Sequence, residues 1–483
     1  MNKDSRDFAG GATTDYEPWH PELERYPLAK MPKLAPVEQK TREALYRQSK
    51  KQPPRDYGFA RDRDIAKYYS AEAMQREWKG LWTKTWLLVG NANDVPTPNS
   101  FMKVDIGKES ILIVRGEDGS LRAMYNVCQH RGTRLVTQDF GRSKKFICPF
   151  HHWEFGNDGS CLKVAKAETF RKETLANDFS LPRVKVDTWN GLVFINLNPD
   201  AEPLLEFLPA EFRDMLEAYD LARWIRVVDV EQEWPVNWKT ALESFIEGYH
   251  VEAIHPQMNP YFDSYYVQQD LYDNGFARSI FPFMSPMPTH PSYNKAGLSD
   301  EHKVFMRDAG LTESEFPERS VDVRAAIVEA KRRNQDRLGM DYARFTDEQL
   351  VDDWNIGVFP SATFNIHPEG MLFQRWWPHA HDPRKMVYYY QVYAMPGVKE
   401  MPTYMGVPKD ADTSGTKVLP RTHSATGDLE VLGSVLSQDA TFLPRLQAGL
   451  ESDGFRGSVF SEQELRIRQF HAEYHKRLDA VKD

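Results

Sequence analysis

The chain has 483 residues, of which 41% are hydrophobic and 12% aromatic, and it carries a formal net charge of −9. This length exceeds the roughly 250 to 300 residues at which a single core stops growing, so we expect two domains. The negative charge argues against a nucleic-acid partner, since a phosphate-binding face normally makes a domain basic. No apolar run approaches the ~20 residues that cross a bilayer, and no apolar segment follows the charged N-terminus, so we expect a cytoplasmic protein without membrane segments.

The first 200 residues predict an arm followed by a β domain. Residues 1–60 are rich in proline and charge and show no sustained hydrophobic period, which indicates an extended arm. A helical pattern over 71–78 then leads into short alternating runs such as 110–114, closed by a turn at 117–119. Asn190-Gly191 favours a two-residue hairpin turn between 188–189 and 192–195. We therefore predict an antiparallel β domain over residues 61–200.

The pattern becomes helical after Pro203. Apolar residues recur at helical spacing over 204–216, and further helices are predicted over 321–338 and 461–479. The last helix is expected to begin with a capping box formed by Ser461 and Glu464. Strands are predicted over 226–230 and 386–392. Residues 201–483 are thus predicted to form a second domain of helices and a sheet, and the fold class is α+β.

Two short loops of the predicted β domain carry metal-ligand residues. Cys128 and His130 stand in the first loop, and Cys148 and His151 follow after 17 intervening residues. Each loop thus offers one thiolate and one imidazole, which suits a [2Fe–2S] cluster with two cysteines on one iron and two histidines on the other. Zinc is the alternative, although Cys₂His₂ zinc sites usually group like ligands together.

Two further residues near these loops are ambiguous. His152 directly follows His151 and is a second candidate ligand, although the spacing favours His151. Cys161 has no remaining cysteine with which to pair in a reducing compartment, so we expect a small buried side chain there.

A second group of candidate ligands is the motif Glu247-x-x-His250-x₄-His255. Five residues of one continuous helix separate two side chains by about 140°, so a break near His255-Pro256 is needed for both imidazoles to reach one ion. Taken alone, such a pair is more often an ordinary surface or core pair. An enzyme with an electron-carrying cluster also needs a second site at which the electrons are used for chemistry. Two histidines with one carboxylate can bind non-haem Fe(II) and leave coordination positions open for such chemistry.

The sequences Cys-Gln-His-Arg-Gly at 128–132 and Cys-Pro-Phe-His-His-Trp at 148–153 resemble the Rieske domain of ring-hydroxylating oxygenase large (alpha) subunits. One departure is His152, where the family most often has glycine. The motif at 247–255 resembles the family's bridging acid and two iron histidines, and Glu247 stands where members usually have aspartate. Glu243 and Glu252 are the next candidates for the bridging acid.

The resemblance implies a third iron ligand late in the chain. We assign this carboxylate to Asp439 in the segment 436–440, with Asp453 as the alternative. The pair His379 and His381 also has metal-ligand spacing, but its proline-flanked setting indicates a surface turn.

The resemblance also implies partners and a mechanism. Members form head-to-tail homotrimers, to which a small beta subunit can be added, and the cluster of one subunit lies near the iron of the next. In this chain the bridge would run from His151 through Glu247 to His250. Electrons from NAD(P)H would arrive through a reductase and/or ferredoxin and would activate O₂ at the iron. The expected activity is that of a mono- or dioxygenase, with Glu247 as the catalytic bridge.

The substrate is less well indicated. One group of apolar residues follows the iron motif and could line a channel or form packing core: Tyr261, Phe262, Tyr265, Tyr266, Phe281, Phe283, Met284 and Met287. A later group is expected in the pocket wall or the core of the sheet: Phe359, Phe364, Phe373, Trp376 and Trp377. The leading hypothesis is hydroxylation of a hydrophobic, aromatic small molecule. The alternatives are monooxygenation or N-demethylation of a quaternary ammonium compound held by aromatic faces, and a Rieske electron carrier, which the length of the chain argues against.

Overall fold

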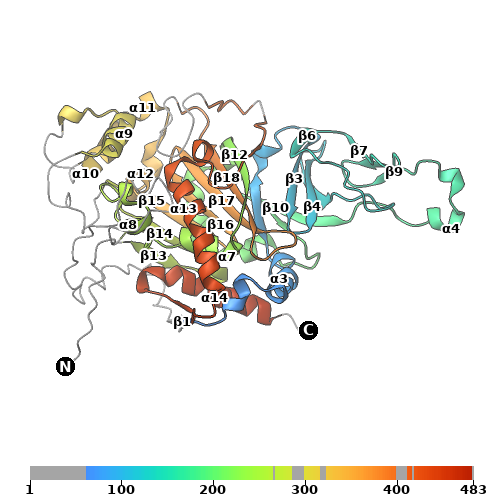
Figure 1. Ribbon diagram of the computed structural model, residues 1–483. Coiled ribbons are helices and arrows are strands. Elements are labelled where there is room, and N and C mark those ends of the chain that lie inside the picture. The colour runs from blue at the N-terminus through green and yellow to red at the C-terminus, as the bar shows by residue number, and fades with distance from the viewer. Residues whose placement is uncertain are drawn as a thin grey trace.

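The computed structural model describes residues 61–264, 267–284, 298–315, 323–398, 411–415 and 418–480. The arm predicted over 1–60 lies outside these residues, and so do Tyr265, Tyr266 and Met287. Figure 1 shows a body of helices around one large sheet, from which a β domain projects to one side. The chain is therefore of mixed α+β class, as predicted.

The projecting domain contains a seven-stranded antiparallel sheet and a small three-stranded sheet. In spatial order the larger sheet consists of β2 (Leu87–Asn91), β11 (Leu192–Asn196), β10 (Arg183–Trp189), β5 (Leu121–Tyr125), β4 (Glu109–Arg115), β3 (Ser100–Ile106) and β6 (Phe140–Arg142). The smaller sheet consists of β7 (Lys145–Ile147), β8 (Glu154–Gly156) and β9 (Cys161–Lys163). The predicted hairpin is present, since Trp189 pairs with Leu192 and both turn residues, Asn190 and Gly191, have positive φ.

The second sheet has eight strands. Their order is β13 (Gln268–Leu271), β14 (Ala277–Phe281), β15 (Asp353–Val358), β16 (Ala362–His367), β17 (Gly370–Pro378), β18 (Met386–Ala394), β12 (Ile225–Trp234) and β19 (Thr422–His423). All neighbours are antiparallel except β12 and β19. The strands predicted over 226–230 and 386–392 thus lie side by side as β12 and β18, although they are far apart in the sequence.

Helices pack around this sheet. The larger ones are α7 (Trp238–Phe245), α9 (Asp300–Ala309), α10 (Val323–Arg333), α13 (Leu429–Leu450) and α14 (Leu465–Asp479), and the short ones are α8 (Val251–Ile254), α11 (Gln335–Leu338) and α12 (Asp347–Val351). Helix α7 packs on β17, and α13 packs on α7 and crosses in front of the sheet in Figure 1. No helix in the described part of the chain is both long and apolar enough to cross a membrane.

Three predicted helices differ in detail from those observed. The helix expected over 321–338 is divided at Asn334 into α10 and α11, and residues 321 and 322 lie outside the described residues. The helix expected over 204–216 is divided into α5 (Leu204–Phe207) and α6 (Ala210–Leu216), because Pro209 interrupts the backbone hydrogen bonds between them. In the last helix the amide of Ser461 donates to the Glu464 carboxylate, but regular α-helix begins only at Leu465.

The segment that enters the β domain contacts the other domain. Strand β1 (Arg61–Asp62) pairs with β20 (Ser458–Val459), and Glu77 of α3 (Ala71–Glu77) accepts hydrogen bonds from Trp238, Lys239 and Tyr474. Residues 61–77 therefore pack against α7 and α14. The domain boundary at residue 61 remains a prediction.

Candidate metal centres and substrate pocket

The two cysteine and histidine loops face each other at the end of the β domain. The Nδ1 atoms of His130 and His151 are 3.1 Å apart, and the buried thiols of Cys128 and Cys148 lie within hydrogen-bonding reach of each other. His130 stacks on Trp153 at a centroid distance of 5.0 Å. The four predicted ligands are thus assembled as one thiol pair and one imidazole pair.

This pairing fits two irons better than one zinc. A tetrahedral zinc ion with bonds of about 2.0 to 2.3 Å brings all four ligand atoms within about 4 Å of one another. Among the described residues, the groups of three or more ligand atoms that converge within 4.8 Å include neither of these loops. The thiol pair and the imidazole pair are therefore separated, as expected when each pair holds its own iron.

The structure also distinguishes His151 from His152. In the first loop the backbone amide of Cys128 donates to the carbonyl of Thr133, and the amide of Gly132 donates to the carbonyl of Cys128. The second loop repeats this pattern, with Cys148 donating to Trp153 and His152 donating to Cys148. Gly132 and His152 therefore occupy equivalent positions, and both have positive φ, 82° and 58° respectively. Position 152 therefore requires a left-handed backbone, which explains the glycine usual in the family. His152 is exposed, whereas His151 faces His130.

Cys161 is half-buried on β9, so the expectation of a buried side chain was wrong. Strand β9 lies in the small sheet with only β8 beside it, which leaves this thiol partly open to solvent.

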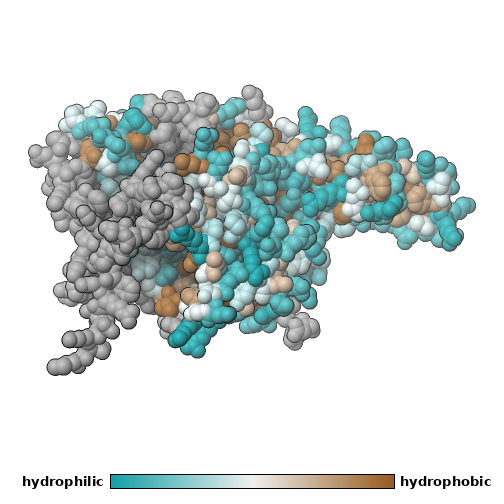
Figure 2. All heavy atoms as spheres, in the orientation of Figure 1, coloured by the Kyte–Doolittle hydropathy of each residue, from teal (hydrophilic) through white to brown (hydrophobic). Residues whose placement is uncertain are grey.

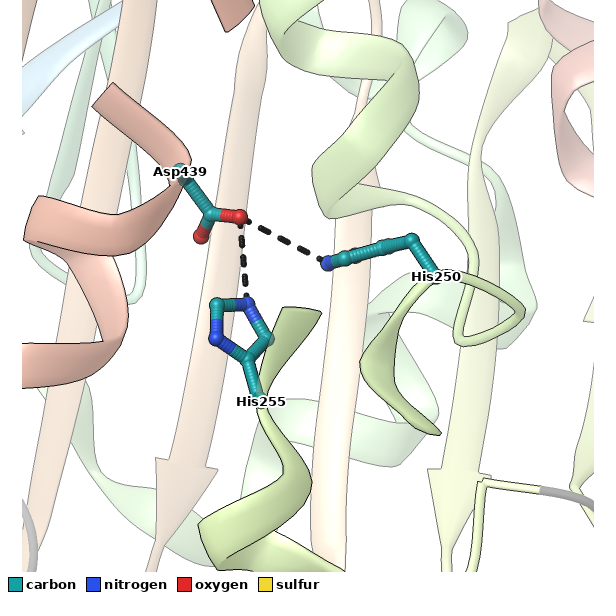
Figure 3. Close-up of side chains that lie close together, drawn as sticks. All are labelled: His250, His255 and Asp439. Atoms are coloured by element: carbon teal, nitrogen blue, oxygen red, sulfur yellow. Dashed lines mark hydrogen bonds and ion pairs between the residues drawn. The ribbon is translucent and has the colours of Figure 1, made fainter. Parts of the chain in front are cut away.

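The second group of ligands converges beneath α13. Nε2 of His255 lies 3.1 Å from Oδ1 of Asp439, and Nε2 of His250 lies 3.7 Å from the same oxygen (Figure 3). Asp439 is buried in the middle of α13, and His255 is also buried. Two imidazoles and one carboxylate therefore point at a common position.

Hydrogen bonds fix the orientation of both imidazoles. Nδ1 of His250 donates to Oε1 of Glu247, and Nδ1 of His255 donates to Oε1 of Gln438 at 2.7 Å. Each Nε2 is thereby left as the free ring nitrogen on the side of Asp439. This is the usual arrangement of metal-binding histidines, whose other nitrogen is held by an acceptor.

The charge of this site favours a bound cation. Burial alone would lower the pKa of His250, but the carboxylates of Glu247 and Asp439 outweigh it and raise the pKa to about 9. Positive charge is thus strongly stabilised between these carboxylates. A divalent metal ion would supply that charge and would bind both Nε2 lone pairs.

The local backbone explains how histidines five residues apart can meet. Helix α7 ends at Phe245, His250 is the N-cap of the one-turn helix α8, and His255 is its C-cap with φ −119°. The break expected at His255-Pro256 is present. An additional break at 246–250 was not predicted, and it separates Glu247 and His250 from α7.

The alternative candidates for the iron ligands, and Glu243 as an alternative bridging acid, lie away from this site. Asp453 is exposed beyond the end of α13, and His379 accepts backbone hydrogen bonds within the turn between β17 and β18. The carboxylate of Glu243 accepts from Tyr68 at 2.7 Å, inside the packing between α7 and α14. In a further convergent group, Asp139, Glu231 and His423, both carboxylates are already paired with Arg421.

A cavity of about 550 Å³ opens beside the three converging ligands. Its apolar lining includes Tyr261, Phe262, Phe281 and Phe283 from the first predicted group. Met284 is buried in the core instead, and the later aromatic residues, Phe359 to Trp377, belong to core clusters. Part of the pocket wall is thus built from residues 258–283, which follow the iron motif, and α9, the sheet and α13 supply the rest.

Comparison with known families agrees with this geometry. The Rieske [2Fe-2S] domain matches residues 85–180, and the family described as ring hydroxylating alpha subunit (catalytic domain) matches residues 221–480. The chain belongs to the ring-hydroxylating alpha-subunit family. The antiparallel β domain is therefore a Rieske domain, and the mixed domain that follows is the catalytic domain.

Several relatives of this alpha subunit have a named activity. The carnitine monooxygenase oxygenase subunit of Acinetobacter pittii is 34% identical over 261 residues, 52% of this chain and 63% of that protein. The glycine betaine monooxygenase oxygenase subunit of Pseudomonas aeruginosa is 30% identical over 207 residues, 42% of this chain and 46% of that protein. The matched region thus spans less than two thirds of either relative.

Solved structures show the same fold as this alpha subunit. The quaternary ammonium Rieske monooxygenase CntA with L-carnitine has a TM-score of 0.59 at 20% identity and covers 88% of this chain and 100% of that chain. Naphthalene 1,2-dioxygenase with indole also has a TM-score of 0.59, at 19% identity, over 86% and 91% of the two chains.

Two residues of the alpha subunit that sequence reasoning did not single out contribute to the site. Gln438 accepts a hydrogen bond from His255, and its position next to Asp439 is the feature of the sequence that could have indicated this role. Asp353 at the start of β15 lines the pocket, and no motif marks it in the sequence.

Proposed function

We propose that this alpha subunit is the terminal component of a Rieske oxygenase system, which uses O₂ and electrons from NAD(P)H to oxygenate a small organic molecule. A reductase and/or ferredoxin would deliver the electrons, and a cytoplasmic location is part of the proposal. The observation that carries it is the convergence of His250, His255 and Asp439 at a 550 Å³ cavity, in a chain that also has a Rieske domain.

The residues present fit both metal groups. Cys128, Cys148, His130 and His151 would hold the [2Fe–2S] cluster, and His250, His255 and Asp439 would hold Fe(II). When bound, the cluster supplies single electrons and the Fe(II) supplies the open positions at which O₂ is activated.

The protein side chains would orient and enclose these groups. Glu247 and Gln438 hold the imidazoles so that both Nε2 atoms face Asp439. The aromatic wall keeps water away from a bound substrate, which strengthens the electrostatic interactions in the pocket. No protein side chain has to act as a general base in this scheme.

The proposed assembly is a head-to-tail homotrimer, in which Glu247 of one subunit would contact the partner subunit's His151. Its support is two exposed aromatic residues that flank the proposed bridge. Phe150, next to His151, is 54% exposed, and Tyr249, next to His250, is 61% exposed. Apolar residues gather on the projecting end of the Rieske domain, around β7 and β9 (Figure 2). Such exposed apolar surface is typical of protein interfaces.

Two substrate classes fit a pocket with aromatic walls. One is an aromatic hydrocarbon or acid, for which the rings offer stacking surface. The other is a quaternary ammonium compound, for which the ring faces offer cation–π contacts. The relatives named for carnitine and glycine betaine favour the second class.

The test is an oxygen-uptake assay with NADH and a surrogate reductase, combined with iron analysis of the purified protein. The proposal predicts three irons per chain and O₂ uptake that depends on an organic substrate. An electron carrier would contain two irons per chain and would show no substrate-dependent uptake from a panel of aromatic acids, polycyclic arenes and betaines.

A further inference from the structure

One carboxylate of the pocket wall has no part in the metal site. Asp353 begins β15, is 6% exposed and lines the cavity. Its Oδ2 accepts a hydrogen bond from the Asn365 side chain at 2.8 Å. Asp353 pairs directly with Phe281 of β14, so the two side chains stand on the same face of the sheet.

Asp353 lacks a close cationic partner among the described residues of the pocket. Within the described part of the chain, Nε2 of His367 is the one ion-pairing nitrogen within 4 Å of Oδ1 of Asp353, at 3.9 Å. Burial together with Lys331 lowers the pKa of His367 to about 3, so this ring is neutral. Arg466 also acts on Asp353 electrostatically, but its Nη1 donates to Ser279 and Asn355. No lysine or arginine is among the described lining residues.

The wall around Asp353 is aromatic. Ring centroids lie 4.9 Å apart for Phe262 and Phe281, 5.1 Å for Phe262 and Phe283, and 5.4 Å for Phe283 and Phe305. Tyr261 adds a ring 5.9 Å from Phe283. All of these residues line the cavity. Aromatic faces together with a carboxylate form the usual recognition site for an organic ammonium ion.

We propose that the substrate is an organic ammonium ion whose positive charge is paired with Asp353 and lies against the aromatic wall. This inference rests on the proposed oxygenase function and names its substrate class. A neutral arene provides no counter-ion, so the buried Asp353 carboxyl would either carry a poorly compensated charge, which is costly, or take up a proton. Pairing with a cation removes that cost, so Asp353 would determine specificity.

The test compares choline with 3,3-dimethylbutan-1-ol, which has the same shape but no charge. Binding to the iron-loaded protein is measured by isothermal titration calorimetry without reductase. The wild-type protein should bind choline at least tenfold more tightly than the neutral isostere. Asp353→Asn should reduce this ratio to about one, because the amide keeps the contact with Asn365 but not the charge.

Asp300→Asn is the matched control. This residue also lines the pocket, but its side chain is 94% exposed, so its charge is screened by solvent and the ratio should stay within about twofold of the wild-type value. If the wild-type protein binds choline and 3,3-dimethylbutan-1-ol equally well, the proposal is wrong. It is also wrong if Asp353→Asn keeps the wild-type ratio of the two affinities. Iron content and O₂ uptake are measured separately, so failure of the ammonium proposal can be distinguished from failure of the oxygenase proposal.

Discussion

Gln438 accepts a hydrogen bond from Nδ1 of His255 at 2.7 Å, and both side chains are buried. The next residue, Asp439, lies 3.1 Å from the other nitrogen of the same ring. Two consecutive residues of α13 thus contact the two nitrogens of one imidazole, Gln438 as the acceptor that orients the ring and Asp439 as the proposed fellow ligand. The position of α13 on α7 therefore determines the geometry of the site.

Gln438→Leu should weaken mononuclear iron binding about 10- to 100-fold, because the His255 ring loses the acceptor that fixes its tautomer. A competitive titration with an Fe(II) chelator measures this affinity. The visible absorption of the cluster is the internal control and should not change. Wild-type iron affinity in this variant would show that Gln438 has only a packing role.

Cys148→Ser should abolish the visible absorption of the purified protein, because a serine hydroxyl replaces one of the two thiolates that hold the cluster. Cys161→Ser is the matched control, since this cysteine is half-buried on β9 outside the two loops. A full spectrum in Cys148→Ser, or bleaching in Cys161→Ser, would refute the assignment of the cluster ligands.

Glu247→Gln should leave both metal centres in place but slow electron transfer from cluster to iron at least tenfold. The amide offers one acceptor oxygen where the carboxylate offers two, so the proposed bridge between subunits loses a partner. Single-turnover reoxidation of the reduced cluster with substrate and O₂ measures the rate. Glu252→Gln should behave like wild type. Unchanged reoxidation in Glu247→Gln would move the bridging role to another residue.

Choline affinity should depend on pH through Asp353. Burial raises the pKa of this carboxyl to about 7, with Asn365 opposing and Asp352 adding to the shift. Below this pKa the carboxyl is neutral, so the affinity should fall by up to about tenfold per pH unit towards pH 5 and level off above pH 8. His367 stays neutral over this range. Calorimetry from pH 5 to 8 should show this dependence in wild type and lose it in Asp353→Asn; a flat wild-type profile would contradict the role of Asp353.

Features set by local sequence could be predicted. The Asn190-Gly191 hairpin, the strands over 110–114, 226–230 and 386–392, and the break at His255-Pro256 depend on neighbouring residues. The paired Cys/His loops and the Glu247 to His255 motif were visible because their members lie within a few residues of each other.

Features that depend on tertiary packing could not be predicted from the sequence. The contact of Gln438 with His255 joins residues 183 positions apart, and only the docking of α13 brings them together. Asp353 reaches the pocket through the register of β15 with β14, which a single sequence does not specify. The extra break at 246–250 was missed because the sequence before His250 continues a helical pattern.

The most direct test of the central claim is the iron content of Asp439→Ala beside Asp453→Ala. Both changes remove one late carboxylate, but only Asp439 faces the two histidines, whereas Asp453 is exposed. We predict that Asp439→Ala contains two irons per chain, keeps the full cluster spectrum and shows no substrate-dependent O₂ uptake, while Asp453→Ala keeps three irons and wild-type uptake. Three irons and normal uptake in Asp439→Ala would contradict the proposed iron site and the oxygenase function built on it.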